Sequence, residues 1–290
     1  MTLLVLLVAC NVVLAIIFKV FSQYKVDNLN AIIVNYIVCV VVASVALGHF
    51  VIPSNLFSIK WIGFSIALSL CFIIGFNLMA YSYQKAGVAL TAIVAKMSLI
   101  LPVIFAVAIY NESLPILKIL GIISAIAAII LVNLPSDDEQ KISLSKEILI
   151  LPILVWLLSG IIEIILYYVQ VEEYVTNDSI IFVSTSFAFA AILGFLFSSY
   201  RAVAKRIYPK WRDLLGGIAL GLPNFLTIYL LLYLLEKGWE GTVLFPINNV
   251  SVLLLTTIVG VVFYQEKVNR LKSVGLILSL VAIVLIGMNV

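Results

Sequence analysis

Lys96 and Glu163 are ionisable residues that stand inside long apolar stretches of this sequence. A charge near the middle of a membrane helix costs about 2.5–3.5 kcal/mol, so such residues tend to be retained for a purpose. Lys96 could bind the carboxylate or phosphate of a ligand, or could extend its aliphatic stem to the membrane surface. It could also belong to a buried structural pair. We favour the ligand contact.

Glu163 allows two interpretations of equal weight. Burial disfavours the ionised form of a carboxyl group. A neutral Glu163 could simply bond to a neighbouring polar group, or it could load a proton on one side of a membrane and release it on the other. A direct pair between Lys96 and Glu163 is a further possibility that the spacing leaves open.

Amide and phenol side chains recur in the apolar stretches of both halves of the chain, and the run Phe245-Pro246-Ile247-Asn248-Asn249 is the densest. Such groups either bond between helices, typically for under about 2 kcal/mol, or line a binding cavity, which we favour. The predicted substrate-binding residues are Asn11, Asn77, Tyr81, Lys96, Glu163, Asn224, Tyr229, Asn248 and Asn249. Pro102, Pro223 and Pro246 are expected to kink helices and act in gating.

Signatures of soluble enzymes do not occur in the sequence. His49 is the single histidine, Asp137 and Asp138 are adjacent without metal-ligand spacing, and Cys10, Cys39 and Cys71 stand far apart. There is no glycine-rich phosphate loop. We therefore expect no enzyme, no metal, no cofactor, no nucleic-acid partner and no ATP-driven pumping.

Composition identifies the elements that must position these residues. Hydrophobic residues make up 64% of the chain and charged residues only 11%, whereas soluble domains carry about 25% charged residues. Apolar runs of about twenty residues, the length needed to span a bilayer as a helix, recur throughout. The predicted fold is an all-α membrane protein of ten helices, the first retained as a span: 2–21, 31–47, 61–84, 88–109, 115–133, 148–171, 178–198, 212–236, 241–263 and 271–289.

An internal repeat divides the chain. The motif Tyr110-Asn111-Glu112 recurs as Tyr264-Gln265-Glu266, and Gly121 recurs as Gly275, always 154 residues apart. We expect two five-helix repeats, 1–134 and 148–290, joined by the polar linker 135–147. An odd number of spans in each half gives the two repeats opposite orientations in the membrane, the inverted topology of many secondary transporters.

The basic residues predict the orientation. Thirteen of the seventeen lysines and arginines lie in or beside the odd-numbered loops, and three lie in the even-numbered ones. By the positive-inside rule, the odd loops face the cytoplasm and both termini lie outside. The basic and aromatic segment 198–213 is expected to anchor at the cytoplasmic membrane surface.

Repeated residues near the helix ends favour structural roles. Glu112 and Glu266 each precede a helix, where Ser113 or Asn269 could act as the cap and a carboxylate is favoured by the helix dipole. Gly121 and Ala125, like Gly275 and Ser279, are small residues four apart that permit close helix packing. That packing could join the fifth and tenth helices to each other or could form a homodimer, so monomer and homodimer both stay open.

Two segments of the chain, 96–133 and 245–289, resemble the drug/metabolite transporter superfamily. Each contains an apolar helix with an aromatic-polar-Glu ending, followed by a glycine-containing helix. The ten-helix EamA-type branch fits best. The resemblance implies a multi-pass protein of the cell (inner) membrane, a central cavity, alternating access, and substrates such as amino acids, sugars, nucleotide derivatives or drugs. The second loop is nearly neutral, unlike the basic second loop of many members. A flippase for a lipid-linked substrate and a non-transporting scaffold or receptor are the alternatives.

Overall fold

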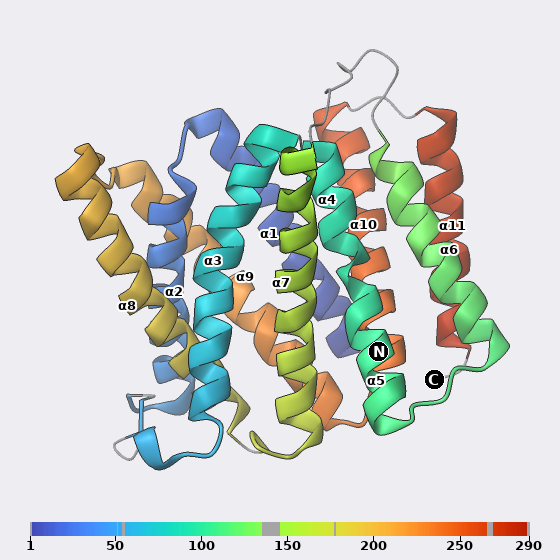
Figure 1. Cartoon of the computed structure of the whole chain (residues 1–290), viewed down its shortest axis with the longest axis horizontal. Helices are drawn as coiled ribbons and strands as arrows, with labels where there is room; N and C mark the ends of the chain where they lie inside the picture. The colour runs from blue at the N-terminus through green and yellow to red at the C-terminus, as the bar shows by residue number, and fades with distance from the viewer. Residues whose placement is uncertain are drawn as a thin grey trace. The chain divides into compact units, whose positions relative to one another are not determined.

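The computed structural model describes residues 2–50, 52–53, 56–86, 88–134, 146–176, 178–265 and 269–288. Within these ranges the regular elements are helices (Figure 1). They are α1 (Thr2–Tyr24), α2 (Asn28–Leu47), η1 (Leu56–Ser58), α3 (Ile62–Ala86), α4 (Val88–Lys96), η2 (Met97–Leu99), α5 (Ile100–Tyr110), α6 (Ile116–Asn133), α7 (Lys146–Val171), α8 (Ser179–Lys205), α9 (Trp211–Glu236), α10 (Gly241–Tyr264) and α11 (Arg270–Gly287).

Ten stretches of the described chain are helical, long and apolar enough to cross a membrane. This confirms the predicted all-α membrane fold. The largest difference in extent is in α8, which continues to Lys205 rather than ending near residue 198, so that the first part of the expected surface anchor is a helical turn.

The expected helix 88–109 is divided into α4, the 3₁₀ turn η2 and α5. Pro102 lies in the first turn of α5, and a proline inside a helix clashes with the carbonyl of the residue four positions earlier, here Ser98 in η2. The expected helix therefore changes to a 3₁₀ turn just before Pro102, and a role of this proline in gating stays a prediction. In contrast, α9 and α10 continue unbroken through Pro223 and Pro246.

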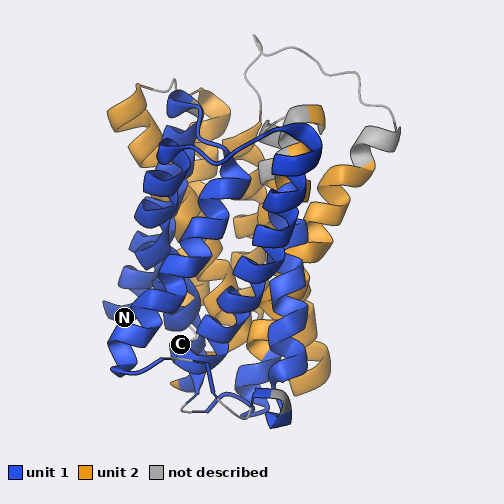
Figure 2. Ribbon diagram, turned by 90° about the vertical axis from the view of Figure 1, so that its left-hand side faces the viewer, with its two compact units in different colours: residues 1–77, 168–236 blue, residues 78–167, 237–290 orange. Residues whose placement is uncertain are grey.

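The chain forms two compact units, coloured separately in Figure 2. Unit 1 comprises residues 1–77 and 168–236, and unit 2 comprises residues 78–167 and 237–290. Each unit draws helices from both of the expected halves, 1–134 and 148–290. The linker expected at 135–147 lies largely outside the described residues. The two units are defined by which residues contact one another, whereas a repeat is defined by similarity between two segments of the chain. The units therefore do not test the inverted repeat, which stays a prediction.

Unit 1 is held by close approach of α9 to α2. A Cβ atom on Gly217 would lie 2.4 Å from the carbonyl oxygen of Ala31, and one on Gly221 would lie 2.2 Å from Val38. Only glycine permits backbones this close. Tyr36 and Phe187 stack with ring centroids 5.5 Å apart beside these contacts, so unit 1 combines backbone contact with aromatic packing.

One end of unit 1 is fixed by two carboxylates, the partly buried Asp27 and the buried Asp213. Asp27 caps α2 by accepting from the Asn30 N–H at 3.1 Å, and Arg201 donates to both of its oxygens at 3.2 and 2.7 Å. Asp213 accepts from the backbone N–H groups of Asp27 and Lys210, each at 2.8 Å. Burial alone would raise the pKa of Asp27, but the hydrogen bonds and charge of Arg201 and the Asn30 bond outweigh it and hold that pKa below its ordinary value.

In unit 2, α6 packs against α11 through the predicted glycines. A Cβ atom on Gly121 would lie 2.6 Å from Ile286, and one on Gly275 would lie 2.7 Å from Val132. The two contacts are reciprocal, because Ile286 follows Val132 by the same 154 residues that separate the glycines. The prediction that the fifth and tenth helices pack closely on each other is confirmed.

The same spacing recurs in the helix boundaries of unit 2. Helix α6 begins at Ile116 and ends at Asn133, and α11 begins at Arg270 and ends at Gly287. Asn111 and Gln265, also 154 residues apart, end α5 and α10 in the left-handed conformation with φ of 54°. The internal likeness therefore extends from sequence to backbone.

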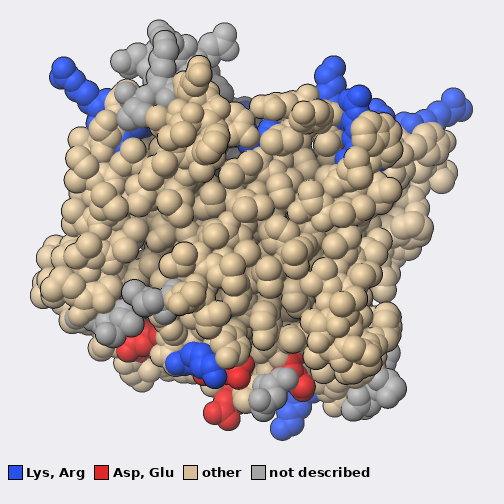
Figure 3. Space-filling model, turned by 180° about the vertical axis from the view of Figure 1, so that it is seen from behind, with Lys and Arg blue, Asp and Glu red and all other residues tan. Residues whose placement is uncertain are grey.

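The surface matches a lipid environment. On the face shown in Figure 3, the charged side chains lie at the ends of the helices, and uncharged side chains cover the stretch between. Large apolar side chains are exposed on many of the described helices, for example Phe195 of α8 at 64% and Leu196 at 61%. Water-soluble monomers rarely expose contiguous apolar surface of this extent. This is a multi-pass membrane protein.

Candidate functional site

Three of the predicted site residues meet in unit 2, from three different helices. Lys96 is the last residue of α4, Glu163 lies on α7, and Asn249 lies on α10. The Lys96 Nζ donates to Asn249 Oδ1 at 3.3 Å, and Asn249 Nδ2 donates to Glu163 Oε1 at 3.2 Å. Lys96 thus has a protein partner within the unit, and its role in binding stays a prediction.

Asn249 is the bridge between the two charges. Its side chain is buried, and its Nδ2 also donates to the Phe245 carbonyl oxygen at 3.1 Å. Lysine can only donate and an ionised carboxylate can only accept, so this amide orientation alone satisfies both neighbours. Among the ion pairs of the described residues, Lys96 and Glu163 do not pair directly. The structure joins them through the amide.

Glu163 is incompletely satisfied. Its Oε2 atom is buried and has no hydrogen-bond partner, while Oε1 receives Asn249. Ser98 of η2 is a further polar neighbour and is itself buried. A buried acceptor without a partner costs about 1–3 kcal/mol, and more when it is charged. A proton on Oε2 or a donor supplied by a ligand would remove that cost.

The break at η2 helps to position this group. Lys96 is the last residue of α4, and the backbone stays in the right-handed helical region through η2 into α5. The next residues turn more tightly, and Ser98 comes to lie beside Glu163. The geometry offers a fixed cation, a bridging amide and a carboxyl group that can gain or lose a proton.

Four of the other predicted site residues lie in unit 1. Asn11 donates to the Leu7 carbonyl at 3.0 Å and Asn77 to the Ile73 carbonyl at 2.8 Å, each within its own helix. Asn224 approaches Cys39, with Nδ2 4.0 Å from the sulfur. Tyr229 packs along α9, with its ring 5.9 Å from that of Phe225. Their role in binding stays a prediction.

Tyr81 and Asn248 belong to unit 2. The Tyr81 side chain is about half exposed, and the Lys85 ammonium lies 5.9 Å from its ring centroid. Asn248 precedes the bridging Asn249 on α10 and has a contact of its own. Their role in binding stays a prediction.

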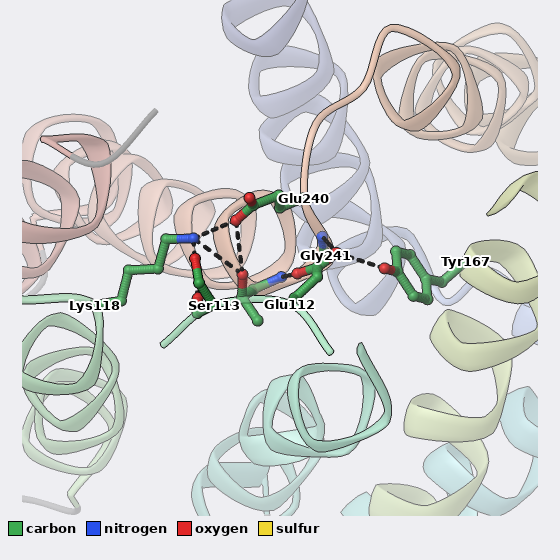
Figure 4. A network of polar contacts seen from close by, with 7 residues as sticks. Glu112, Ser113, Lys118, Tyr167, Glu240 and Gly241 are labelled. Atoms are coloured by element: carbon green, nitrogen blue, oxygen red, sulfur yellow. Dashed lines mark hydrogen bonds and ion pairs between the residues drawn. The ribbon is translucent and has the colours of Figure 1, made fainter. Parts of the chain in front are cut away.

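A second polar network of unit 2 was not predicted as such. Glu112, in the loop between α5 and α6, accepts from the Tyr167 hydroxyl and from the backbone N–H groups of Gly241 and Thr242, the latter two at 2.8 Å each (Figure 4). These N–H groups begin α10, so Glu112 caps a helix far along the chain. The expected carboxylate at a helix N-terminus is present, but the helix is not the following one.

Lys118 completes this network. Its side chain is buried, it forms an ion pair with Glu240, and it donates to the Ser113 carbonyl at 3.3 Å (Figure 4). Helix α6 begins after Pro115 without a side-chain cap, so Ser113 is not the cap that the sequence suggested. Asn269 does cap α11, accepting from the Lys272 N–H at 2.8 Å. Glu266 lies outside the described residues.

Comparison with known proteins adds three findings. Residues 2–134 match the model of the EamA-like transporter family. An uncharacterized protein of Haemophilus influenzae is 27% identical over 293 residues, covering 97% of this chain and 95% of that protein. A solved crystal structure shares the fold with a TM-score of 0.78 and 14% identity, covering 99% of this chain and 96% of its own.

The family match falls on the half of the chain that ends with α6, and it includes Lys96, Pro102 and Glu112. The Haemophilus influenzae protein is similar to this chain over nearly its whole length, and the crystal structure shares the fold over a comparable length. The resemblance predicted from the sequence is therefore confirmed: residues 2–134 match the EamA-like transporter family, and the ten apolar helices are consistent with a member of the drug/metabolite transporter superfamily.

Proposed function

We propose that this chain is a secondary transporter that moves a small metabolite or drug across the membrane by alternating access. The observation that carries the proposal is the Lys96–Asn249–Glu163 group, a fixed cation and an incompletely bonded carboxyl group joined by a buried amide. Groups of this kind inside membrane proteins mark substrate and proton pathways. The match to a transporter family supports the same conclusion.

In this proposal, Lys96 is the electrostatic anchor for substrate and Glu163 the proton-coupling group. The other predicted binding residues contribute polar contacts, and Pro102, Pro223 and Pro246 serve the conformational change. During alternating access, two five-helix repeats of inverted topology would exchange their conformations. The recurrence of the 154-residue spacing in the bounds of α6 and α11 supports the repeat.

We further propose that the protein lies in the cell membrane with both termini outside. Supporting this, Arg201, Lys205, Arg206, Lys210 and Arg212 all lie at the end of unit 1 where α8 ends and α9 begins. A cysteine introduced beside Lys205 should react with a membrane-impermeant thiol reagent only after the cells are opened. Labelling in intact spheroplasts would contradict the proposed orientation and favour the opposite one.

The test of transport begins with a thermal-shift screen of amino acids, sugars, nucleotide derivatives and drugs on the purified protein. Each compound that stabilises the protein is then loaded, unlabelled, into liposomes that contain the purified protein. Counterflow is measured as the entry of the labelled compound from outside. A transporter exchanges labelled for unlabelled compound, whereas a scaffold or receptor binds without counterflow. Scrambling of a fluorescent lipid in the same liposomes would instead favour the flippase.

A further inference from the structure

The Lys96–Asn249–Glu163 group also contains information about the charge of its ligand, provided that the proposed transport function holds. The lysine ammonium has three N–H donors, and one of them is directed to Asn249 Oδ1. On the opposite side, Glu163 keeps Oε2 without a partner. Donor capacity is therefore left at the cation, and acceptor capacity is left at the carboxyl group.

The two charges differ in how firmly each is held. Lys96 lies at the junction of α4 and η2, and its ammonium has a hydrogen-bond acceptor in Asn249 Oδ1, whereas Glu163 has one oxygen atom without a partner. Glu163 lies within α7, more than a dozen residues after its start at Lys146 and eight before its end at Val171, so neither helix end assists its negative charge. Any change of charge in this group therefore falls on Glu163.

Charge balance then determines what binds. With Lys96 positive and Glu163 negative, the group is neutral, and a bound anion would leave a net negative charge among buried residues, where charges are poorly screened. One proton taken up by Glu163 restores neutrality. It also supplies an O–H donor at Oε2, the atom that has no partner.

We propose that the site accepts a small monoanion, such as a carboxylate, at the Lys96 ammonium, and that each anion binds together with one proton on Glu163. The proton comes from bulk water and binds at Oε2, and no other bond forms or breaks. Asn249 links the two events, because its amide contacts both Lys96 and Glu163.

The surroundings of Glu163 leave it as the group that takes the proton. Lys96 faces it from α4 through Asn249, the Ser98 hydroxyl lies within hydrogen-bonding reach of it from η2, and Asn249 donates to it from α10. On α7 itself, Tyr167 lies one turn further along, with its hydroxyl bonded to Glu112. Among the described neighbours, Lys96 and Glu163 carry the charges.

The experiment uses matched probes that differ only in charge: propionate, propionamide and propylammonium, and benzoate, benzamide and benzylammonium. Binding to the full-length protein in detergent is measured by calorimetry between about pH 6 and about pH 9, where the carboxylates stay ionised. The carboxylates should bind, and the amides and amines should not. Apparent affinity should rise as the pH falls, by about tenfold for each unit over the range in which Glu163 is ionised in the unliganded protein.

Proton uptake provides a second readout. Calorimetry in two buffers of different ionisation enthalpy should show about one proton taken up for each carboxylate bound. Glu163→Gln, which resembles the protonated form, should bind the anion with an affinity independent of pH and without proton uptake. Lys96→Met should lose binding, while Lys85→Met, which removes an exposed lysine of the same unit, should behave as wild type.

The outcomes separate this proposal from the transport function itself. Binding of the amines in preference to the carboxylates, carboxylate binding without a pH dependence, or proton uptake that survives in Glu163→Gln would each overturn the proposal. Counterflow of an amine or amide in liposomes would contradict the proposal that the substrate is an anion, and would still support the proposal that the protein is a transporter. Failure of every probe to bind would overturn the anion class, and an absence of counterflow for all compounds in the wider screen would overturn transport.

Discussion

Unit 2 contains two clusters built from the same kinds of residue, and they differ in how completely they are bonded. At the ends of helices, both Glu112 oxygens accept hydrogen bonds, and Lys118 has Glu240 and the Ser113 carbonyl as partners. Within the helices, Lys96 and Glu163 share one amide, and Glu163 Oε2 has no partner.

The difference indicates which cluster can change state. A network in which every group has a partner loses bonds whenever a proton or ligand enters, so it favours a single conformation. A network with unused donors and acceptors can gain a proton or a ligand without losing a bond. The two clusters contain the same residue types, and the count of unsatisfied atoms is what distinguishes them.

The largest effect is expected from removing the carboxylate of the helix-end cluster. Glu112→Ala leaves the N–H groups of Gly241 and Thr242 and the Tyr167 hydroxyl without their acceptor, which should lower the free energy of unfolding by at least about 3 kcal/mol. The thermal unfolding midpoint in detergent measures this. Glu112→Gln, which keeps an acceptor oxygen, should lose less. A midpoint equal to wild type in Glu112→Ala would remove the structural role.

The next effect sharpens the contrast between the two lysines. Lys96→Met removes an intramembrane charge, so it should insert and unfold like wild type, yet substrate binding should weaken by about 1.5–3 kcal/mol, as for other lost charged contacts. Lys118→Met should show the reverse, a lower unfolding midpoint with unchanged affinity. Unchanged affinity in Lys96→Met would instead favour the lysine that extends to the membrane surface.

Substitution of Glu163 is expected to change the free energy of unfolding little and to change transport strongly. Glu163→Gln conserves volume and removes the cost of a buried charge, so the free energy of unfolding should stay within about 1 kcal/mol of wild type or rise. Exchange of substrate across liposome membranes should persist, and uptake driven by a pH gradient should be lost. Gradient-driven uptake equal to wild type would leave Glu163 a structural group.

The smallest effect concerns unit 1, where Asp27 is a fully bonded carboxylate like Glu112. Its lowered pKa means that it stabilises the fold above the ordinary aspartate pKa of about 3.9, and that this contribution is lost as the pH falls through the folded-state value. Asp27→Asn should therefore unfold below wild type at neutral pH, and the gap should narrow in acid. A gap that stays constant with pH would contradict the Arg201–Asp27 contribution.

The helices could be predicted because their signal is local. An apolar run of about twenty residues has one low-energy state in a bilayer, and the ten helices follow from it. The division of the fourth helix could have been anticipated more precisely, because Pro102 acts on the carbonyl of Ser98 and not at its own position. The glycine pairs 121 and 275 gave the α6–α11 contact because close approach of two helices requires small side chains.

The partners of the site residues depend on packing between distant segments, which the sequence alone does not express. Lys96, Glu163 and Asn249 were each singled out by their polarity, but the bridge through Asn249 follows from where α4, α7 and α10 lie. Glu112 was assigned to the helix after it and instead caps α10, more than a hundred residues later. Polarity identified the participants, and the tertiary fold selected their partners.

The reciprocal contact between α6 and α11 has a genetic consequence. When two identical chains pack across a twofold axis, each contact occurs twice, with the two residues exchanged between the chains. Here both versions of the contact are encoded in a single chain. The two copies can then mutate separately. The residue 154 positions after Lys96 is Val250, and α10 continues unbroken where α4 ends and η2 begins. In the proposed repeat, the helix bounds are therefore alike in the two segments, whereas the lysine occurs in the first segment and not at the matching position of the second.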